Sequence, residues 1–279
     1  MDRAEVEIRP LETRAELEAC VALQQEIWGD AFGDLVPPSL LKVVQRIGGV
    51  AAGAFAPDGA LLGFVYGMTG VERGRLVHWS DMLAVRAGSR NGGIGRRLKE
   101  YQRVAVRELG VEVIYWTFDP LIARNAHLNF NKFGVTAAEY VEDMYGVTAS
   151  TLHGGLPTDR LVVAWPTRDE EVATRVADAR RLLESDDCAD APVATTAWLE
   201  SAAGASILPH CVRVELPANA EALIVAGADD VLHSRLSVRH GLQWGLASGY
   251  GITAFRFDDD GARGYYLLTR AGRGTGTSR

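Results

Sequence analysis

Residues 82–98 read Met-Leu-Ala-Val-Arg-Ala-Gly-Ser-Arg-Asn-Gly-Gly-Ile-Gly-Arg-Arg-Leu. The apolar run at 82–85 predicts the end of a strand. The apolar spacing over 94–109 predicts an amphipathic helix that Gly110 ends. Glycines before a helix let the backbone approach an anion, and the first N–H groups of the helix point at that anion. This stretch therefore predicts a strand–turn–helix unit that binds a pyrophosphate.

Basic side chains gather around the same turn. Residues 86–107 contain seven Lys and Arg residues and one acid, although the formal net charge of the chain is −7. A charge run alone is typical of a solvated helix face, but the neighbouring glycines favour anion binding. The acidic balance of the whole chain argues against a surface built for nucleic acid.

Three known glycine motifs can be compared with this turn. The Gly-x4-Gly-Lys-Ser/Thr pattern of a P-loop does not occur in the chain. The dinucleotide pattern Gly-x-Gly-x-x-Gly fails because Leu98 stands at its third glycine. The pattern that fits is Arg-x-x-Gly-x-Gly, at Arg90, Gly93 and Gly95. It resembles the turn of the GNAT superfamily of acyl-CoA-dependent N-acyltransferases.

This resemblance implies a fold class and a cofactor. The fold class is α/β, with a GNAT-like mixed, centrally splayed β-sheet flanked by helices and a smaller C-terminal α/β unit. Backbone groups of Leu83, Ala84 and Val85 would pair with the pantetheine arm of acetyl-CoA or another acyl-CoA. The residues expected to wrap the pyrophosphate are Arg90, Asn91, Gly92, Gly93, Ile94, Gly95 and Arg96.

A second segment, at 125–134, resembles the family more loosely. It reads Asn-Ala-His-Leu-Asn-Phe-Asn-Lys-Phe-Gly, and the resemblance implies that Asn125, Asn129 and Lys132 extend the cofactor site. The superfamily resemblance covers about residues 1–165. Within it, the stretches at 117–127 and 154–160 resemble a poorly characterised branch of predicted acetyltransferases of about this length.

Phe130 departs from the family pattern. The family often has a tyrosine at this position, which protonates the departing CoA thiolate, and phenylalanine has no proton to donate. Either another group supplies the proton or the thiolate leaves without one, which a thiol pKa of ~8.5 makes tolerable. The candidate donors are Tyr140, Tyr145 and Ser80.

The family's reaction is direct attack of an amine on the thioester carbonyl, so positioning and a modest base are sufficient. His78 is the first candidate base because the ordinary pKa of histidine is close to neutrality, and a half-buried structural histidine is the alternative. Asp81 is a second candidate, with a loop cap as its alternative. The candidate catalytic residues are His78, Ser80, Asp81 and Tyr140.

Strand alternation in the same region predicts that His78, Ser80 and Met82 share one face of the strand. The resemblance to the GNAT superfamily implies that residues 76–82 approach the acceptor site and that the segment at 26–34 borders it. Side chains there that can border an acceptor pocket, or serve only in packing, are Glu26, Trp28, Phe32 and Asp34.

The chain is divided into three predicted segments. Residues 1–165 form the acyl-CoA-binding domain, 166–204 an acidic helical linker, and 205–279 a smaller α/β unit that resembles a degenerate GNAT half. In that unit Arg235 and Arg239 lie four residues apart on one helix face. They bind either a substrate carboxylate or a neighbouring acidic loop, and we favour the loop.

Composition narrows the remaining classes. The chain has 279 residues, 47% of them hydrophobic, and no apolar run reaches the ~18 residues of a membrane span. Its charged N-terminus is unlike a signal peptide. The three cysteines have no paired spacing, which argues against a disulfide framework and a zinc site and favours a cytoplasmic location. We expect no metal, no nucleic acid and no membrane partner, and a homodimer.

The predicted function is transfer of an acetyl or succinyl group from acyl-CoA to the primary amine of a small molecule, with an amino acid as the expected acceptor. The alternatives are a non-catalytic CoA-binding or regulatory protein and a protein N-acetyltransferase. An open, acidic acceptor groove would favour a protein acceptor. A closed pocket that holds an arginine would favour a small carboxylated one.

Overall fold

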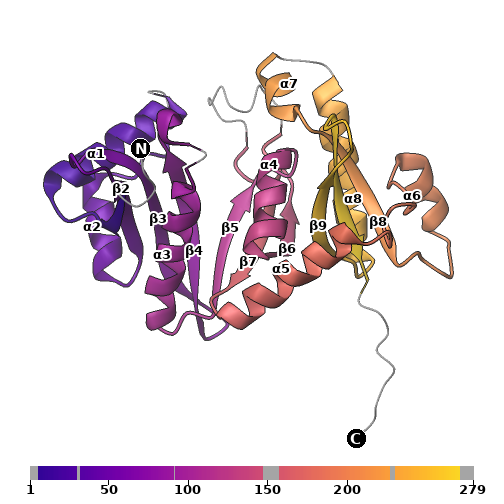
Figure 1. The fold of residues 1–279 in the computed structure, drawn as a ribbon, viewed down its shortest axis with the longest axis horizontal. Helices are drawn as coiled ribbons and strands as arrows, with labels where there is room; N and C mark the ends of the chain where they lie inside the picture. The colour runs from indigo at the N-terminus through magenta and orange to yellow at the C-terminus, as the bar shows by residue number, and fades with distance from the viewer. Residues whose placement is uncertain (1–5, 30–31, 91, 147–156, 227–229, 271–279) are drawn as a thin grey trace, which may run out of the picture. The chain divides into compact units, whose positions relative to one another are not determined.

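The computed structural model describes residues 6–29, 32–90, 92–146, 157–226 and 230–270 (Figure 1). The chain forms two compact units. Unit 1 is Met1–Trp116 with Pro166–Arg168, and unit 2 is Thr117–Trp165 with Asp169–Arg279. The chain passes between the units at 116/117, 165/166 and 168/169, so one of these points falls at the predicted boundary after residue 165 and none falls at the predicted boundary after residue 204. The three predicted segments therefore stay a prediction.

Seven strands follow the order β1-β2-β3-β4-β5-β7-β6. Neighbours from β1 to β4 pair antiparallel, whereas β4 and β5 pair parallel, so the sheet is mixed. A separate three-stranded sheet, ordered β8-β10-β9, is formed by the C-terminal part of the chain. This arrangement confirms the predicted α/β fold class with a smaller C-terminal α/β unit.

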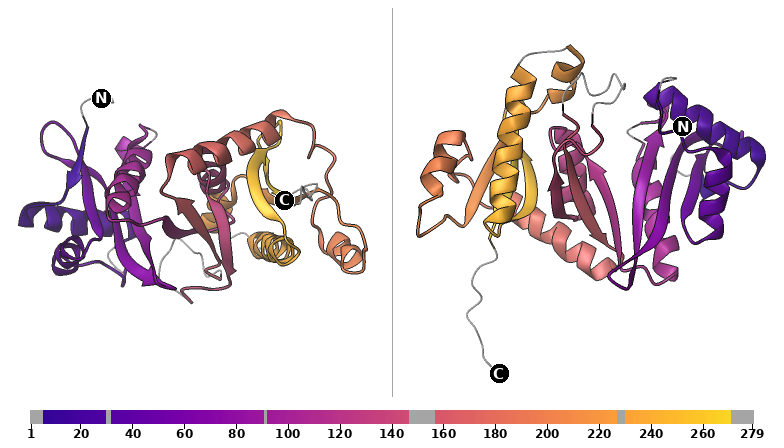
Figure 2. Two further views of the ribbon diagram at one scale, coloured as in Figure 1. Left: turned by 90° about the horizontal axis from the view of Figure 1, so that it is seen from below. Right: turned by 180° about the vertical axis from the view of Figure 1, so that it is seen from behind.

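Unit 1 places helices on both faces of its strands (Figure 2). One face is covered by α1 and α2, and the other by α3. A capping box between Thr13 and Glu16 begins α1, as the sequence predicts. The bounds of the elements are β1 (Glu7–Pro10), α1 (Arg14–Trp28), α2 (Pro38–Arg46), β2 (Val50–Phe55), β3 (Leu61–Glu72), β4 (Arg75–Val85), the short 3-10 helix η2 (Ala87–Ser89), α3 (Ile94–Glu108) and β5 (Val113–Phe118).

A β-bulge interrupts β4. Tyr66 of β3 pairs with Met82, but the next residue, Gly67, pairs with Ser80, so Asp81 has no partner on β3. A bulge bends its strand and changes the alternation of side chains by one residue. It also turns the side chain of the extra residue away from the regular pattern.

The bulge divides β4 into two parts whose side chains face opposite ways. Before it, His78 and Ser80 are hydrogen-bonded to side chains of α3. After it, Met82 and Ala84 pack in the core cluster formed with α1 and α2. The prediction that His78, Ser80 and Met82 share one face is therefore wrong, because it assumes regular alternation through a point where the strand contains an extra residue.

Unit 2 contains the rest of the strands and helices. The elements at 136–141, 196–202 and 220–226 were not predicted from the sequence. The bounds are α4 (Ala123–Ala126), the π-helix η3 (His127–Phe133), β6 (Thr136–Val141), β7 (Arg160–Pro166), α5 (Asp169–Glu184), α6 (Thr196–Ala202), β8 (Cys211–Pro217), α7 (Ala220–Ala226), α8 (Asp230–Ala247), β9 (Gly251–Phe257) and β10 (Arg263–Thr269).

The outer edge of β9 is closed by a side chain. Asn131, in η3, donates to the carbonyl of Phe255 over 2.7 Å and accepts from the N–H of the same residue over 2.9 Å. The amide therefore pairs with the strand as a neighbouring strand would. Phe130, beside it, packs edge-on against Phe118 and Tyr266.

Two of the three cysteines are joined. A disulfide links Cys188, after α5, to Cys211 at the start of β8, while Cys20 is free and buried. The expectation that the cysteines stay unpaired is wrong for this pair. Their separation of 23 residues shows no motif, and the fold alone brings them together.

Candidate functional site

The glycine turn forms the N-terminus of α3 as predicted. Gly93 is the N-cap in the left-handed region, with φ of 79°, and no side chain caps this end of the helix. The N–H groups of the first turn have no acceptor within a helix, so they are available to an anion. Arg96 is exposed beside them, and Arg90 donates to the carbonyl of Val85 over 3.1 Å. Asn91 lies outside the described residues.

The end of β4 packs against the start of this helix. Leu83 and Val85 point toward Gly95, while Ala84 is buried on the opposite side with α1 and α2. Ile94 is also buried, which fixes the first turn of α3 beside the strand. The predicted contacts of residues 83–85 and 90–96 with a cofactor stay a prediction.

A strand edge of β4 lies open beside β5. The parallel register consists of Val77 with Val113, His78 with Ile114, and Trp79 with Tyr115. Beyond Trp79, β4 continues to Val85 without a β5 partner in this register. Such an edge presents backbone N–H and C=O groups to an extended ligand, and here it leads directly to the glycine turn.

His78 is fully buried between two polar side chains. Its Nδ1 lies 2.9 Å from Thr69 Oγ1, and its Nε2 lies 3.0 Å from Gln102 Nε2. Thr69 donates its proton to the carbonyl of Gly48, so it accepts from Nδ1–H, and Nε2 accepts from Gln102. Burial, followed by the charge of Lys99, lowers the pKa of His78 to about 4. These contacts favour the structural alternative for His78, and a catalytic role stays an untested prediction.

Ser80 is paired with a lysine that the sequence analysis missed. Lys99 of α3 is 4% exposed, and its Nζ donates to Ser80 Oγ over 2.7 Å. The same Nζ lies 3.8 Å from the centre of the Trp116 ring. Burial lowers the pKa of Lys99 to about 7. In the sequence Lys99 belongs to a basic run that is typical of a solvated helix face. Lys99 was therefore not identified from the sequence as a buried residue.

Asp81 is the extra residue of the bulge and is exposed. Although the side chain keeps contact with water, partial desolvation of its carboxyl raises its pKa; a hydrogen bond from Trp79 opposes this rise, and the charge of Asp34 adds to it. Asp34 is also exposed. The two carboxylates therefore lie close enough to interact electrostatically on the side where an acceptor was expected.

The other residues of the predicted acceptor border have partners. Trp28 stacks on Phe32 with ring centres 5.5 Å apart, and it meets Phe64 edge-on. Glu26 lies 3.3 Å from Arg86 in an exposed ion pair. The aromatic pair thus serves in packing, and its role toward an acceptor stays a prediction.

The predicted residues of unit 2 are placed as follows. Tyr140 donates to Asp159 over 2.6 Å, and burial, with this hydrogen bond, raises its pKa. That makes its proton harder to release, and its catalytic role stays untested. Asn125 is half-buried, Asn129 is buried and Lys132 is exposed. Because they lie in unit 2 and the glycine turn in unit 1, a shared cofactor site stays a prediction.

Two arginines of α8 face carboxylates. Arg235 binds both oxygens of Asp119 at 2.9 and 2.7 Å. Arg239 binds both oxygens of Asp159 at 2.8 and 2.7 Å, and Glu142 at 2.7 Å. The favoured interpretation of these arginines, as partners of acidic segments of the chain, is confirmed.

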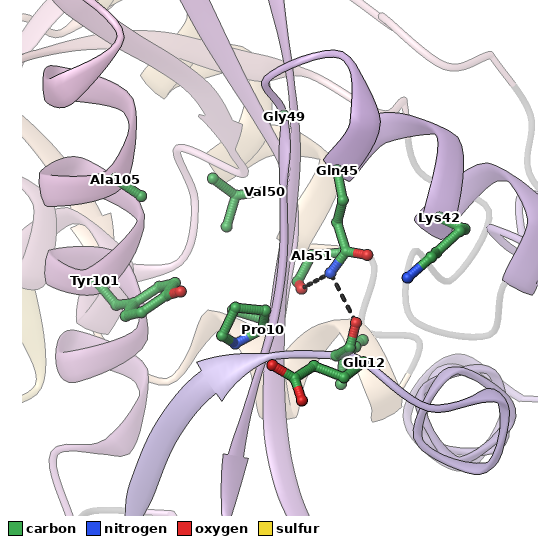
Figure 3. Close-up of a pocket in the computed structure, with 11 residues that line it drawn as sticks. Pro10, Glu12, Lys42, Gln45, Gly49, Val50, Ala51, Tyr101 and Ala105 are labelled. Atoms are coloured by element: carbon green, nitrogen blue, oxygen red, sulfur yellow. Dashed lines mark hydrogen bonds between the residues drawn. The ribbon is translucent and has the colours of Figure 1, made fainter.

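A pocket of about 280 Å³ lies elsewhere in unit 1 (Figure 3). Lys42 and Gln45 of α2, and Tyr101 of α3, contribute to its lining. Gln45 donates to the carbonyls of Leu11 and Ala51, both over 2.8 Å, and so closes part of the space with bonds inside the protein. None of the predicted catalytic or cofactor residues lines this pocket.

Within the part of the chain that the structure describes, no group of three or more His, Cys, Asp and Glu side chains could hold a metal ion. No helix among the described residues has the length and apolarity to cross a membrane.

Comparisons with known proteins give structural matches only. No protein-family model matches the chain, and no curated protein matches it. A ribosomal-protein-S18-alanine N-acetyltransferase from Escherichia coli is 19% identical, with a TM-score of 0.44, over 58% of this chain and 94% of that one. An N-acetyltransferase from Staphylococcus aureus Mu50 is 16% identical, with a TM-score of 0.46, over 58% and 99%.

A third similar structure is an aminoglycoside 6'-acetyltransferase type Ii. It is 18% identical, with a TM-score of 0.46, and the match covers 58% of this chain and 97% of that chain.

Proposed function

We propose that this protein is an acyl-CoA-dependent N-acyltransferase acting on the primary amine of a small molecule. One observation carries the proposal: β4 loses its β5 partner after Trp79, and its open edge leads to the glycine turn of α3. An extended arm with amide groups can pair with such an edge, and a pyrophosphate suits a helix N-terminus. Acyl-CoA carries both parts in this order, whereas ATP has no such arm.

The residues near the bulge suit direct attack by an amine. The amine must be neutral, and the raised pKa of Asp81 makes its carboxylate a better acceptor for the ammonium proton. The thioester oxygen becomes negative as the amine attacks, and a backbone N–H at the end of the unpaired edge can stabilise it. Asp81 is therefore the base that we favour over His78.

The side of β4 where an acceptor was expected is acidic, and this charge favours some classes of acceptor over others. Exposed Asp34 and Asp81 favour an amine that carries positive charge, whether it belongs to a small molecule or to a protein. An amino acid also brings a carboxylate, which these two side chains would repel. Paired acceptors separate the cases: lysine against cadaverine, and phenylalanine against phenethylamine. Faster transfer to the decarboxylated member of both pairs would support a cationic acceptor, and the reverse would support an amino acid.

Phe130 favours a second candidate function, a CoA-binding protein without transferase activity. Its ring is packed between Phe118 and Tyr266, so no proton donor is present at that position. Such a protein would bind CoA and acetyl-CoA equally and would release no thiol with any amine.

The first experiment is thermal unfolding with CoA, acetyl-CoA, succinyl-CoA, NAD and ATP. A ligand at ~100 times its dissociation constant adds about 2.7 kcal/mol, which raises the midpoint by several degrees. We expect shifts with the CoA compounds alone, followed by thiol release with amines.

Arg96→Ala should weaken CoA binding roughly tenfold through a lost charge-assisted contact, and Arg107→Ala, at the other end of α3, should not. Equal shifts with NAD, or none with CoA, would refute the proposal.

A further inference from the structure

Lys99 is a buried amine whose contacts are neutral groups. Its Nζ donates to the Ser80 hydroxyl over 2.7 Å and lies 3.8 Å from the centre of the Trp116 ring. A buried ammonium is ordinarily matched by a carboxylate. Burial alone accounts for the lowering of the Lys99 pKa to about 7. The amine can therefore gain and lose a proton near neutrality.

This amine lies where β4 and β5 part. The last pair in their register joins Trp79 to Tyr115, and the next residue on each strand is Ser80 or Trp116. Lys99 reaches from α3 to both of these residues. The three side chains therefore meet at the vertex of the two strands, which we call the β4–β5 vertex. All of them belong to unit 1.

The position of the vertex relative to the glycine turn is informative. From Val85, at the turn, to Ser80 the strand spans five residues, or ~17 Å at 3.3 Å each. An acyl-CoA whose pyrophosphate occupies the turn and whose arm follows the open edge would place its thioester near the vertex. This placement rests on the proposed function.

We infer that Ser80 and Lys99 form a proton relay to the departing thiolate. Ser80 is the catalytic residue because its hydroxyl would touch the sulfur, and Lys99 is a positioning residue that acts through Ser80. The relay replaces the donor that is missing at Phe130 of η3, and it does so from β4 and α3.

The relay balances in atoms and charges. The amine nitrogen bonds to the thioester carbon, and the carbon–sulfur bond breaks. The sulfur takes the Ser80 proton while Ser80 takes one from the Lys99 ammonium. The amine loses its extra proton to Asp81 or water, and solvent returns a proton to Lys99. The products are an amide and a thiol.

The other groups near Lys99 do not compete for this role. From β4, His78 has both ring nitrogens engaged by Thr69 and Gln102. On its own helix, Arg103 is paired with Glu100 at 2.8 Å. From β5 the facing group is the Trp116 ring. Lys99 is thus the titratable group that contacts Ser80.

The test is the pH dependence of kcat for acyl transfer, from pH 6 to 10, in the full chain. The wild type should lose activity as the pH rises above 7, because Lys99 loses its proton. Lys99→Met and Ser80→Ala should lower kcat by about 10²-fold and abolish this alkaline decline, with KM for acetyl-CoA unchanged. Lys99→Arg, which stays protonated, should restore part of the rate and move the decline to higher pH.

Two control variants separate the effect of Lys99 from the effects of other side chains. Lys42→Met, an exposed lysine of α2, should leave the profile unchanged. Tyr145→Phe tests the rival donor, whose hydroxyl lies 3.3 Å from Thr117 Oγ1. The relay is overturned if Lys99→Met keeps the wild-type rate and profile, if Tyr145→Phe alone removes the decline, or if an acyl group accumulates on Ser80. Failure of the proposed function looks different, because the wild type would then show no transfer.

Should Lys99→Arg fail to fold in this tight site, Lys99→Met and Ser80→Ala still decide the matter. Both shorten or neutralise a side chain without adding volume. Thermal unfolding with acetyl-CoA shows that each variant is folded and binds the cofactor before its kcat is compared.

Discussion

The molecule has two buried polar clusters, and they differ in whether the charged side chain is paired with an opposite charge. In unit 2, Arg235 and Arg239 each hold both oxygens of a buried or nearly buried carboxylate. In unit 1, Lys99 is held by a hydroxyl and an aromatic ring. A matched pair keeps its charges at any ordinary pH, whereas a lone amine in low dielectric loses its proton readily. The first arrangement suits a structural role, and the second suits proton transfer.

The largest effect should follow from breaking a matched pair. Asp119→Asn should lower the free energy of unfolding by about 3–5 kcal/mol, because it leaves the buried charge of Arg235 without a partner. Asn retains the oxygen that accepts from the N–H of Leu121. Urea unfolding measures the loss, and hydrogen exchange resolved by peptide should place it in unit 2. The double variant Asp119→Asn, Arg235→Met removes the buried charge, keeps the acceptor for Leu121, and should recover most of it. A single variant as stable as the wild type would mean that the pair is unimportant.

The pH dependence of stability should reveal the lone amine. The ordinary pKa of 10.5 falls to about 7 in the folded protein, so from pH 7 to 10.5 the unfolded chain binds a proton that the folded chain does not. Stability therefore rises with pH in that window, by up to ~1.4 kcal/mol per pH unit, and is flat for this group below pH 7. Urea unfolding at pH 7, 8 and 9 should show a smaller slope for Lys99→Met. Lys42→Met should keep the wild-type slope, and parallel curves for all three proteins would contradict the assignment.

A smaller effect should come from filling the space beside the vertex. A Cβ at Gly67 would meet the carbonyl oxygen of Trp79 at 2.6 Å and the ring of His78. Gly67→Ala should therefore destabilise the protein by about 1–3 kcal/mol. Gly70→Ala, on the same strand, meets nothing within 4 Å and should have little effect. Equal unfolding midpoints for both variants would show that β3 shifts without strain at this point.

The smallest effect should come from the exposed end of the unit 2 cluster. Glu142 pairs with Arg239, but its side chain is 51% exposed. Glu142→Gln should change the free energy of unfolding by less than ~1 kcal/mol, because water screens the pair. Compared with Asp119→Asn, the Glu142→Gln variant tests whether burial determines how much an ion pair contributes to the free energy of unfolding. A loss as large as that of Asp119→Asn would argue that it does not.

Local sequence signals predicted the parts of the fold that depend on local chemistry. The glycines before Ile94 and the apolar spacing after it specify α3, and Thr13 with Glu16 specifies the start of α1. The strand at 136–141 was missed because none of its residues is buried, so no apolar alternation marks it. The Cys188–Cys211 bond depends on the path of the chain and has no local signal.

The candidate site was only partly predictable for a related reason. The glycine turn is visible as a motif, but the bulge at Asp81 is not, because a bulge depends on how β4 pairs with β3 and has no motif within the strand itself. Lys99 looked solvated because its neighbours in sequence are basic. Burial of Lys99 and Gln102 follows from the strands they face. The predicted helix face instead included Leu109, which is 49% exposed.

The amide of Asn131 has a consequence for how the protein behaves in a crowded solution. β9 is the outer strand of its sheet, and an outer strand offers unpaired backbone groups to any other extended chain. Asn131 occupies the N–H and C=O of Phe255 on that strand. A foreign strand would have to displace two hydrogen bonds before it could pair there. One side chain thus disfavours intermolecular strand addition, the first step of aggregation, at this edge of the sheet.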